Sequence, residues 1–173
     1  MYAGRQQKMM FEVKVSRRLG ESVVGQVQKE IVFRVLQNFN LISVDLTHMQ
    51  IDDGDFKVIV EALPTSQLEY LNLYNNCIRS QGIFAFAAQL PKIQCLKEVN
   101  LGLNFWEQDA ERQDCWAALL QGLRENYSMV RLVAGVYRDN PLQPLVDYYF
   151  CLNQAGRRIL TTSSDVPLGL WPL

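Results

Sequence analysis

The feature that most constrains the fold is an internal repeat with a period of 27 residues. Sliding the sequence against itself by this offset places the segment that begins at Leu41 on the segment that begins at Leu68. Eight apolar positions and a proline then coincide: Leu41 with Leu68, Val44 with Leu71, Leu46 with Leu73, Ile51 with Ile78, Phe56 with Ile83, Ile59 with Phe86, Val60 with Ala87, Leu63 with Leu90, and Pro64 with Pro91. Chance rarely aligns so many positions at one offset, so the chain is built from stacked, similar units.

Weaker copies lie on both sides of this pair. A third copy begins at Leu96, has five extra residues in its middle, and resumes its pattern at Trp116. A fourth copy begins near Met129. Upstream, the alternating residues Phe11, Val13 and Val15 predict a strand, and Val32, Phe33 and Leu36 predict the helical half of an early copy.

These copies divide the chain into three parts. We expect residues 1–40 to form a strand and a helix as a degenerate first repeat, residues 41–137 to form repeats with units starting near 41, 68, 96 and 129, and residues 138–173 to form a C-terminal cap.

Each copy changes its apolar period midway. The first part spaces apolar residues as in an extended strand with one inward face, and the second part spaces them along one stripe of an amphipathic helix. Asp52, Asp53 and Ser80 precede the helical stripes and are expected to cap them, while Pro64 and Pro91 follow the stripes and are expected to end them. Tandem strand–helix units predict parallel strands with helices on one side.

The repeat resembles a known family. The segment LEYLNLYNNCI, residues 68–78, matches the leucine-rich-repeat template L-x-x-L-x-L-x-x-N-x-I at every fixed position, and LKEVNLGLNFW matches it with Val99 and Trp106 as apolar substitutes. Unit lengths of 27 to 33 with a full helix resemble the ribonuclease-inhibitor type. This resemblance, over about residues 25–137, implies an α/β solenoid: a short horseshoe with parallel strands on its concave face and helices on its convex face. Met49 stands where the template has Asn, which implies a looser turn in that unit.

The C-terminal stretch does not continue the repeat. The segments YYFCLNQAGRRIL and VPLGLWPL resemble the C-terminal segment of a leucine-rich-repeat group among predicted proteins of single-celled algae, where it looks like a terminal cap. We expect apolar residues of this stretch to cover the open edge of the last repeat, namely Tyr149, Leu152, Ile159, Leu168, Leu170 and Trp171. A docking motif around Trp171 is the alternative. Arg157 and Arg158 are expected to form salt bridges within the cap.

Composition argues against catalysis and against several classes of partner. A net charge of −1 provides no field for nucleic acid or acidic membranes, and no apolar run approaches the length of a membrane span. The single histidine, His48, and cysteines without a CxxC pair exclude common zinc sites and catalytic triads. No glycine-rich phosphate loop is present. We therefore expect no enzyme activity, no cofactor and no metal. We interpret the four cysteines as buried, reduced thiols. Reduced thiols favour a cytoplasmic location for the protein, and the nucleus is the second possibility.

The remaining candidate site is the concave face that the template itself creates. Strand positions that point away from the helices carry small polar residues and tyrosines, and tyrosine offers a large contact area at low entropic cost. The candidate partner-binding residues are Asp45, Thr47, His48, Tyr70, Asn72, Tyr74, Asn75, Glu98, Asn100 and Leu103. Alignment of the copies places Asp45, Asn72 and Asn100 in one row.

The predicted function is non-catalytic binding of a protein partner on this face. Two alternatives remain open at this point. One is a regulatory leucine-rich-repeat protein of the GTPase-activating type, acting through Arg79, Arg131 or Arg138; the other is a fragment of a larger leucine-rich-repeat receptor or scaffold. The sequence does not specify the partner or the oligomeric state.

Overall fold

Strands and helices alternate in an α/β arrangement around one parallel sheet. The structure is a computed structural model that describes residues 12–14, 41–108, 110–134 and 140–157. The sheet has five strands in the order of the chain, and each neighbouring pair is parallel. The strands are β1 (Glu12–Lys14), β2 (Ser43–Asp45), β3 (Tyr70–Asn72), β4 (Glu98–Asn100) and β5 (Arg131–Val133). The predicted parallel sheet is confirmed, and β1 lies where the alternating residues predicted a strand.

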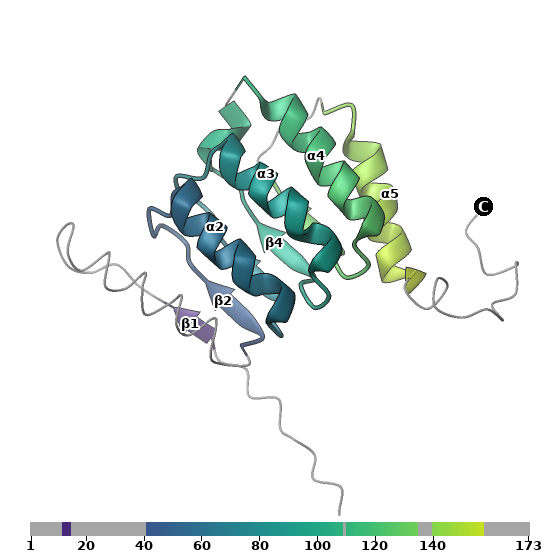
Figure 1. Cartoon of the computed structure of the whole chain (residues 1–173), viewed down its shortest axis with the longest axis horizontal. Helices are drawn as coiled ribbons and strands as arrows, with labels where there is room; N and C mark the ends of the chain where they lie inside the picture. The colour runs from purple at the N-terminus through teal and green to yellow at the C-terminus, as the bar shows by residue number, and fades with distance from the viewer. Residues whose placement is uncertain (1–11, 15–40, 109, 135–139, 158–173) are drawn as a thin grey trace, which may run out of the picture.

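Helices cover one face of the sheet. They are α2 (Asp53–Ala62), α3 (Ser80–Gln89), α4 (Arg112–Glu125) and α5 (Gln143–Gln154), with short 3₁₀ turns η1 (Leu63–Thr65), η2 (Leu90–Lys92) and η3 (Phe105–Gln108). The four α-helices lie side by side in chain order in front of the strands (Figure 1). The predicted helix at Val32, Phe33 and Leu36 falls outside the described residues. The same holds for Ile159, Leu168, Leu170 and Trp171 of the predicted cap.

The register of the sheet reproduces the period of the sequence. Ser43 pairs with Tyr70, at the predicted offset of 27, and Tyr70 pairs with Glu98. Glu98 then pairs with Arg131, so the offset between paired residues is five residues larger in the third unit. The five extra residues of this unit therefore lie between its strand and the next one, and the pairing of the strands continues. Alternate strand residues point to opposite faces, so each row of paired residues faces one side.

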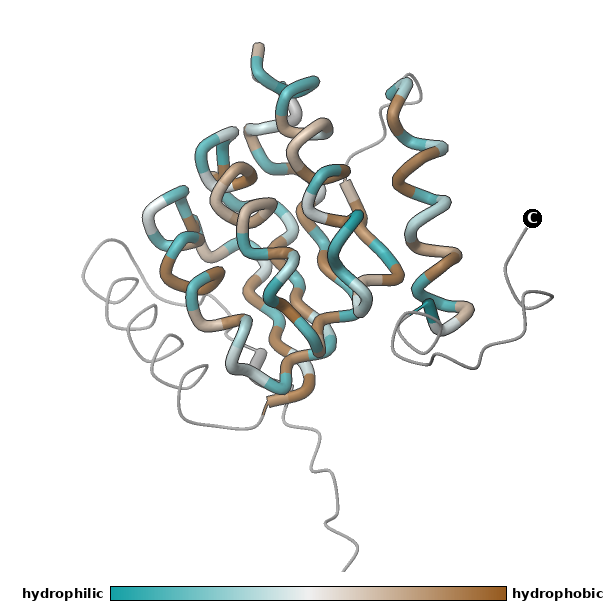
Figure 2. Tube along the Cα trace, turned by 45° about the vertical axis from the view of Figure 1, so that its right-hand side comes forward, coloured by the Kyte–Doolittle hydropathy of each residue, from teal (hydrophilic) through white to brown (hydrophobic). Residues whose placement is uncertain are grey.

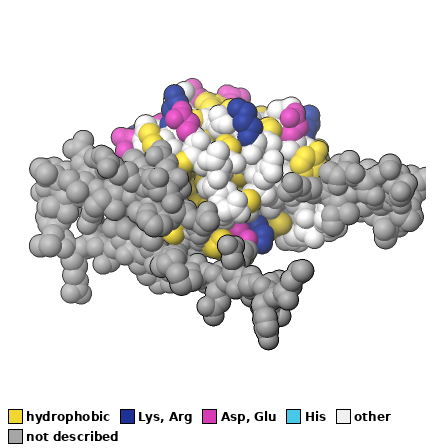
Figure 3. All heavy atoms as spheres, turned by 60° about the horizontal axis from the view of Figure 1, so that its bottom comes forward, with side chains coloured by type: hydrophobic (Ala, Val, Ile, Leu, Met, Phe, Trp, Pro, Cys, Tyr) yellow, Lys and Arg dark blue, Asp and Glu magenta, His cyan; other side chains and the backbone are white. Residues whose placement is uncertain are grey.

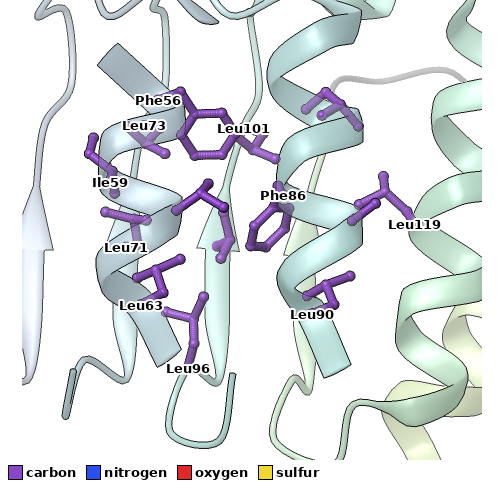
Figure 4. Packing of buried hydrophobic residues seen from close by; sticks show 14 of the residues in the cluster. Phe56, Ile59, Leu63, Leu71, Leu73, Phe86, Leu90, Leu96, Leu101 and Leu119 are labelled. Carbon is purple, nitrogen blue, oxygen red and sulfur yellow. The ribbon is translucent and has the colours of Figure 1, made fainter. Parts of the chain in front are cut away.

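The core lies between the sheet and the helices. Hydrophobic segments recur at regular intervals along the strand–helix units (Figure 2). In each unit the inward strand residue, such as Leu71, meets the apolar stripe of a helix, such as Phe56 and Ile59 of α2 or Phe86 of α3 (Figure 4). Phe56 and Phe86 of neighbouring helices pack with ring centroids 5.8 Å apart. No unit could bury these residues alone, so neighbouring units stabilise each other.

Buried asparagines connect one unit to the unit before it. Asn76 Oδ1 accepts hydrogen bonds from the backbone N–H groups of Met49 (2.9 Å) and Ile51 (3.0 Å), and Asn76 Nδ2 donates to the Leu46 carbonyl (2.9 Å). Asn104 repeats this pattern one unit later, because its Oδ1 accepts from Ile78 N and its Nδ2 donates to the Leu73 carbonyl. The turn at Met49 is therefore held by the asparagine of the next unit. Met49 itself supplies no such side-chain bond, and the expectation of a looser turn there stays a prediction.

The capping residues predicted for the helices are confirmed only in part. Asp52 caps α2 and forms a capping box with Asp55, as its position predicted. Asp53 lies inside the helix, and its carboxylate instead accepts a hydrogen bond from Arg79 N of the next unit at 2.7 Å. Ser80 is the first residue of α3 rather than its cap. Pro64 and Pro91 lie in the 3₁₀ turns that end α2 and α3, as expected.

Helix α5 closes the last repeat. Its Val146 and Phe150 are buried, and Asn153 Nδ2 donates to the Met129 carbonyl at 2.7 Å. Arg157, also buried, donates from its guanidinium to the Leu123 carbonyl at 3.0 Å and to the Asn126 carbonyl.

Arg157 is held by carbonyl groups and aromatic rings. Its guanidinium lies over the rings of Tyr127 (4.6 Å) and Tyr149 (5.0 Å). Burial lowers the pKa of this guanidinium from its ordinary value, while the two tyrosines act in the opposite direction. The expected salt bridge of Arg157 is therefore replaced by carbonyl and aromatic contacts, and Arg158 lies outside the described residues.

The cysteines are free thiols but are not all buried. Cys115 is buried, Cys77 and Cys95 are half-buried, and Cys151 is exposed on α5. The expectation of buried thiols therefore holds for Cys115 and is wrong for Cys151.

Candidate protein-binding face

The face of the sheet opposite the helices is hollowed. Side chains from four successive strands, β2 to β5, line this hollow. They come from Ser43, Asp45, Tyr70, Asn72, Glu98, Asn100, Arg131 and Val133, with backbone of the intervening Val44, Leu71 and Val99. We call this surface the sheet face. It is the surface that the repeat predicted as concave.

The first row of the sheet face carries an exposed aromatic side chain. Tyr70 lies on β3 between Ser43 and Glu98, and 39% of its surface is exposed. The flanking Ser43 has a small side chain. Arg131 follows Glu98 in the same row, and its NH1 lies 3.6 Å from Glu98 Oε2.

The second row runs from Asp45 through Asn72 and Asn100 to Val133, and its polar side chains shape the turns after their strands. Asn72 Oδ1 accepts a hydrogen bond from Tyr74 N, and Asn100 Oδ1 accepts one from Gly102 N, each at 3.1 Å. Asp45 Oδ1 accepts from Thr47 N at 3.0 Å. These residues have a local structural role as Asx turns, so their presence in the row is not by itself evidence of binding.

The remaining candidates lie beyond the strands, on the turns. Tyr74 packs beside Gly102, where an added Cβ would lie 3.4 Å from the tyrosine ring. The Asn75 side-chain amide donates to His48 Nδ1 at 2.6 Å, and the His48 ring meets the Tyr74 ring edge-on at 6.2 Å between centroids. Leu103 follows Gly102 and is exposed. The turns thus extend the sheet face at the carboxyl ends of the strands.

Charges near the sheet face are paired between neighbouring strands. Lys97 Nζ lies 2.7 Å from Glu69 Oε2, and this hydrogen bond raises the pKa of Lys97 above its ordinary value. Figure 3, which brings the lower side of the view in Figure 1 forward, shows basic and acidic side chains scattered among uncharged ones on that side of the molecule. The pairing leaves no concentrated field of one sign at these positions, which favours a protein partner over nucleic acid.

The search for metal-ligand clusters in the described part of the chain gives none: among these residues, no three His, Cys, Asp or Glu side chains come together in a way that could hold a metal ion. The His48 ring contacts the Asn75 amide and the edge of the Tyr74 ring. None of the described helices combines the length and the apolar character that a membrane crossing requires.

The structure brings half of the predicted site residues into the hollow. Asp45, Tyr70, Asn72, Glu98 and Asn100 line it, and Asp45, Asn72 and Asn100 form one row as predicted. The other five lie on the turns beside it: Thr47, His48, Tyr74, Asn75 and Leu103.

Three residues of the hollow were not among the predicted site residues. Ser43 lies on β2, and Arg131 and Val133 of β5 complete the fourth strand. The weak fourth copy could have revealed the two residues of β5, because Leu132 and Ala134 of that copy leave Arg131 and Val133 at the outward positions.

Comparison with known proteins finds solved structures with a similar fold. Neither a protein-family model nor a curated protein matches this sequence. Among solved structures, the fold is similar to that of leiomodin-1 actin-binding site 2, with a TM-score of 0.72 and 18% identity over 87% of this chain and 84% of that one. The tropomodulin C-terminal domain of Caenorhabditis elegans matches with a TM-score of 0.48 and 16% identity, over 78% of this chain and 98% of that one, which is too low to support an argument. The likeness to leiomodin-1 actin-binding site 2 therefore concerns the fold alone.

Proposed function

We propose that this chain is a non-catalytic protein-binding module whose partner docks on the sheet face. The observation that carries the proposal is the position of Tyr70, an exposed aromatic residue on the hollowed side of a rigid sheet. Its neighbours in the row are small or charge-paired, so a partner can bury the ring without leaving an isolated charge. The strand–helix units support a finer assignment to leucine-rich repeats of the ribonuclease-inhibitor-like type, arranged as a short solenoid.

Actin is the candidate partner that we propose to test first. The solved structure with the similar fold is named an actin-binding site, and the likeness spans most of both chains. Because the identity is 18%, the likeness concerns the fold, and the actin assignment depends on a direct measurement.

The size of the sheet face indicates how such a partner must bind. Strands in a sheet lie about 4.8 Å apart, so the four strands of the sheet face span roughly 14 Å from the first to the last. Each of these strands has three residues. A stable interface usually covers about 800 Å² on each partner, and the sheet face alone falls short of this area. We therefore include the adjoining turns around Tyr74 and His48 in the proposed interface.

The test compares two residues of equal exposure on opposite sides of the molecule. Tyr70 on the sheet face and Val58 on α2 are each 39% exposed. Affinity for monomeric and filamentous actin is measured by fluorescence titration and co-sedimentation for the wild type and the variants Tyr70→Ala and Val58→Ala. We expect Tyr70→Ala to weaken binding at least about tenfold, as for a central aromatic contact, and Val58→Ala to leave it unchanged.

The outcomes separate the partner from the site. If the wild-type chain binds neither form of actin, the actin assignment is wrong. If it binds and both variants bind equally well, the sheet face is not the interface. A folded state identical to that of the wild type, checked by circular dichroism, is required for both variants.

The GTPase-activating alternative gains no support from the structure. The Arg79 guanidinium lies 5.0 Å from the centre of the Phe105 ring, and Arg131 lies beside Glu98. Arg138 falls outside the described residues. The similar solved structure is named for binding actin rather than for acting on a GTPase. We therefore do not propose this alternative.

A further inference from the structure

The turns after the strands share an unusual backbone conformation. His48, Asn75 and Leu103 have φ values of 60°, 54° and 56° and occupy the same place in three successive units. In each unit this residue follows the turn made by Asp45, Asn72 or Asn100 and precedes the position of the buried asparagines. The repeat therefore requires a left-handed residue at this point.

Leucine is poorly suited to that position. Asn and His adopt left-handed backbone more readily than other non-glycine residues, because their side chains are short or flat and polar. The first two units follow this preference, and the third unit departs from it. A leucine there is strained whatever space surrounds it.

Burial does not explain Leu103 either. Its exposed fraction of 56% is the highest among the exposed large hydrophobic residues of the described part of the chain. Phe105, two residues later, is also exposed at 42%, and the corresponding positions of earlier units carry Cys77 and Gln50. The Phe105 ring is held under the Arg79 guanidinium. The third turn thus presents two apolar side chains where the other turns are mostly polar.

This turn is continuous with the sheet face. Leu103 directly follows Gly102, against which Tyr74 packs, and Asn75 N donates to the Gly102 carbonyl at 2.9 Å. A partner seated on Tyr70 and Tyr74 would therefore reach Leu103 next. The Arg79 guanidinium lies over the Phe105 ring on this part of the surface, so Leu103 is the more freely exposed of the two apolar side chains.

We propose that Leu103, assisted by Phe105, is an apolar anchor that inserts into an apolar cleft of the folded protein bound on the sheet face. This inference rests on the proposed function and names a specific contact for it. Both side chains are exposed, at 56% and 42%. Exposed apolar side chains of this kind fit a preformed cleft on a folded partner, whereas an extended peptide would require a groove on this chain. The contact also supplies area that the sheet face alone lacks.

The experiment uses substitutions that separate the strain from the apolar contact. Leu103→Asn introduces the residue that the second unit already uses at this position, so the fold is expected to be retained and the melting temperature to rise by a few degrees. Leu103→Met keeps an apolar side chain of similar volume in the same strained backbone. Affinity for actin, dissociation rate and melting temperature are measured for the wild type, both variants and Tyr70→Ala.

We expect Leu103→Asn to bind actin at least about tenfold more weakly, mainly through faster dissociation, although it is the more stable protein. Leu103→Met should bind within about twofold of the wild type. This combination would support the anchor, since a merely structural role would make stability and affinity change together.

Four results would overturn the inference. Wild-type affinity of Leu103→Asn, with Tyr70→Ala impaired, would leave the proposed function standing and exclude the anchor alone. Equal loss of binding in Leu103→Met would exclude an apolar contact. Self-association of the wild type in sedimentation velocity that Leu103→Asn abolishes would assign the anchor to a second copy of this chain. Failure of the wild type to bind actin would instead reject the actin assignment and the anchor together.

Discussion

Removal of the Asn76 side chain tests how the repeats hold together. The variant Asn76→Ala deletes an amide that joins the turn after β2 to the turn after β3. The side chain makes four hydrogen bonds of 2.9 to 3.0 Å, to the N–H groups of Met49 and Ile51 and to the carbonyls of Leu46 and Leu73. All four partners are backbone groups of buried residues.

The size of the effect follows from counting the backbone groups that lose their partner. The Leu73 carbonyl also accepts a hydrogen bond from Asn104 Nδ2, so it remains satisfied in the variant. The Met49 N–H, the Ile51 N–H and the Leu46 carbonyl lose the asparagine. At about 1 kcal/mol for each buried group left unsatisfied, the free energy of unfolding should fall by about 3 kcal/mol.

The assay is equilibrium unfolding in urea, followed by circular dichroism and by tryptophan fluorescence. Agreement between the two probes establishes that the array unfolds as one cooperative unit, which the comparison of free energies requires. Asn72→Ala is the matched control. This asparagine is half-buried and accepts one local hydrogen bond from Tyr74 N, so its loss should cost less than about 1 kcal/mol. If Asn76→Ala is no more damaging than Asn72→Ala, the asparagines do not connect the units.

Three further changes test the helices and the terminal cap. Gly122→Ala should lower the free energy of unfolding by about 1 to 3 kcal/mol in thermal and urea unfolding, because the added Cβ would lie 2.5 Å from the Ala87 carbonyl oxygen. If the variant is instead more stable than the wild type, α3 and α4 can separate at little cost. Asp52→Ala should lower the free energy of unfolding by about 1 kcal/mol by removing the capping box of α2, and an effect below about 0.3 kcal/mol in urea unfolding would contradict that role. Arg157→Met should lower the free energy of unfolding by about 2 to 3 kcal/mol, because two carbonyl groups at the end of α4 lose a charged donor. Hydrogen exchange of the α4 amides measures this effect, and protection equal to that of the wild type would disprove the interpretation.

The sequence alone determined the order and direction of the strands. A fixed offset between copies requires each unit to stack on the next, and a strand–helix unit repeated in tandem places consecutive strands parallel and adjacent. Because side chains alternate along a strand, the same offset also determined which residues share a row. Asp45, Asn72 and Asn100 were placed together on this basis.

Only the tertiary structure decided which groups serve a neighbouring unit. Asn76 was recognisable as a template position, yet its partners at Met49 and Ile51 belong to the preceding turn. Arg157 appeared suited to a salt bridge, and it is surrounded by carbonyl groups and tyrosine rings instead. These contacts join residues more than 20 positions apart, so their geometry depends on how closely the units stack.

The strained backbone at Leu103 was likewise invisible in the pattern, where this residue occupied an ordinary variable position. A periodic sequence specifies which side of the sheet a residue occupies, because alternation is a local property of the strand. Backbone conformation in the turns and the exposure of single side chains depend on the packing of several units at once. The positive φ of Leu103 and its exposure therefore became known only from the structure.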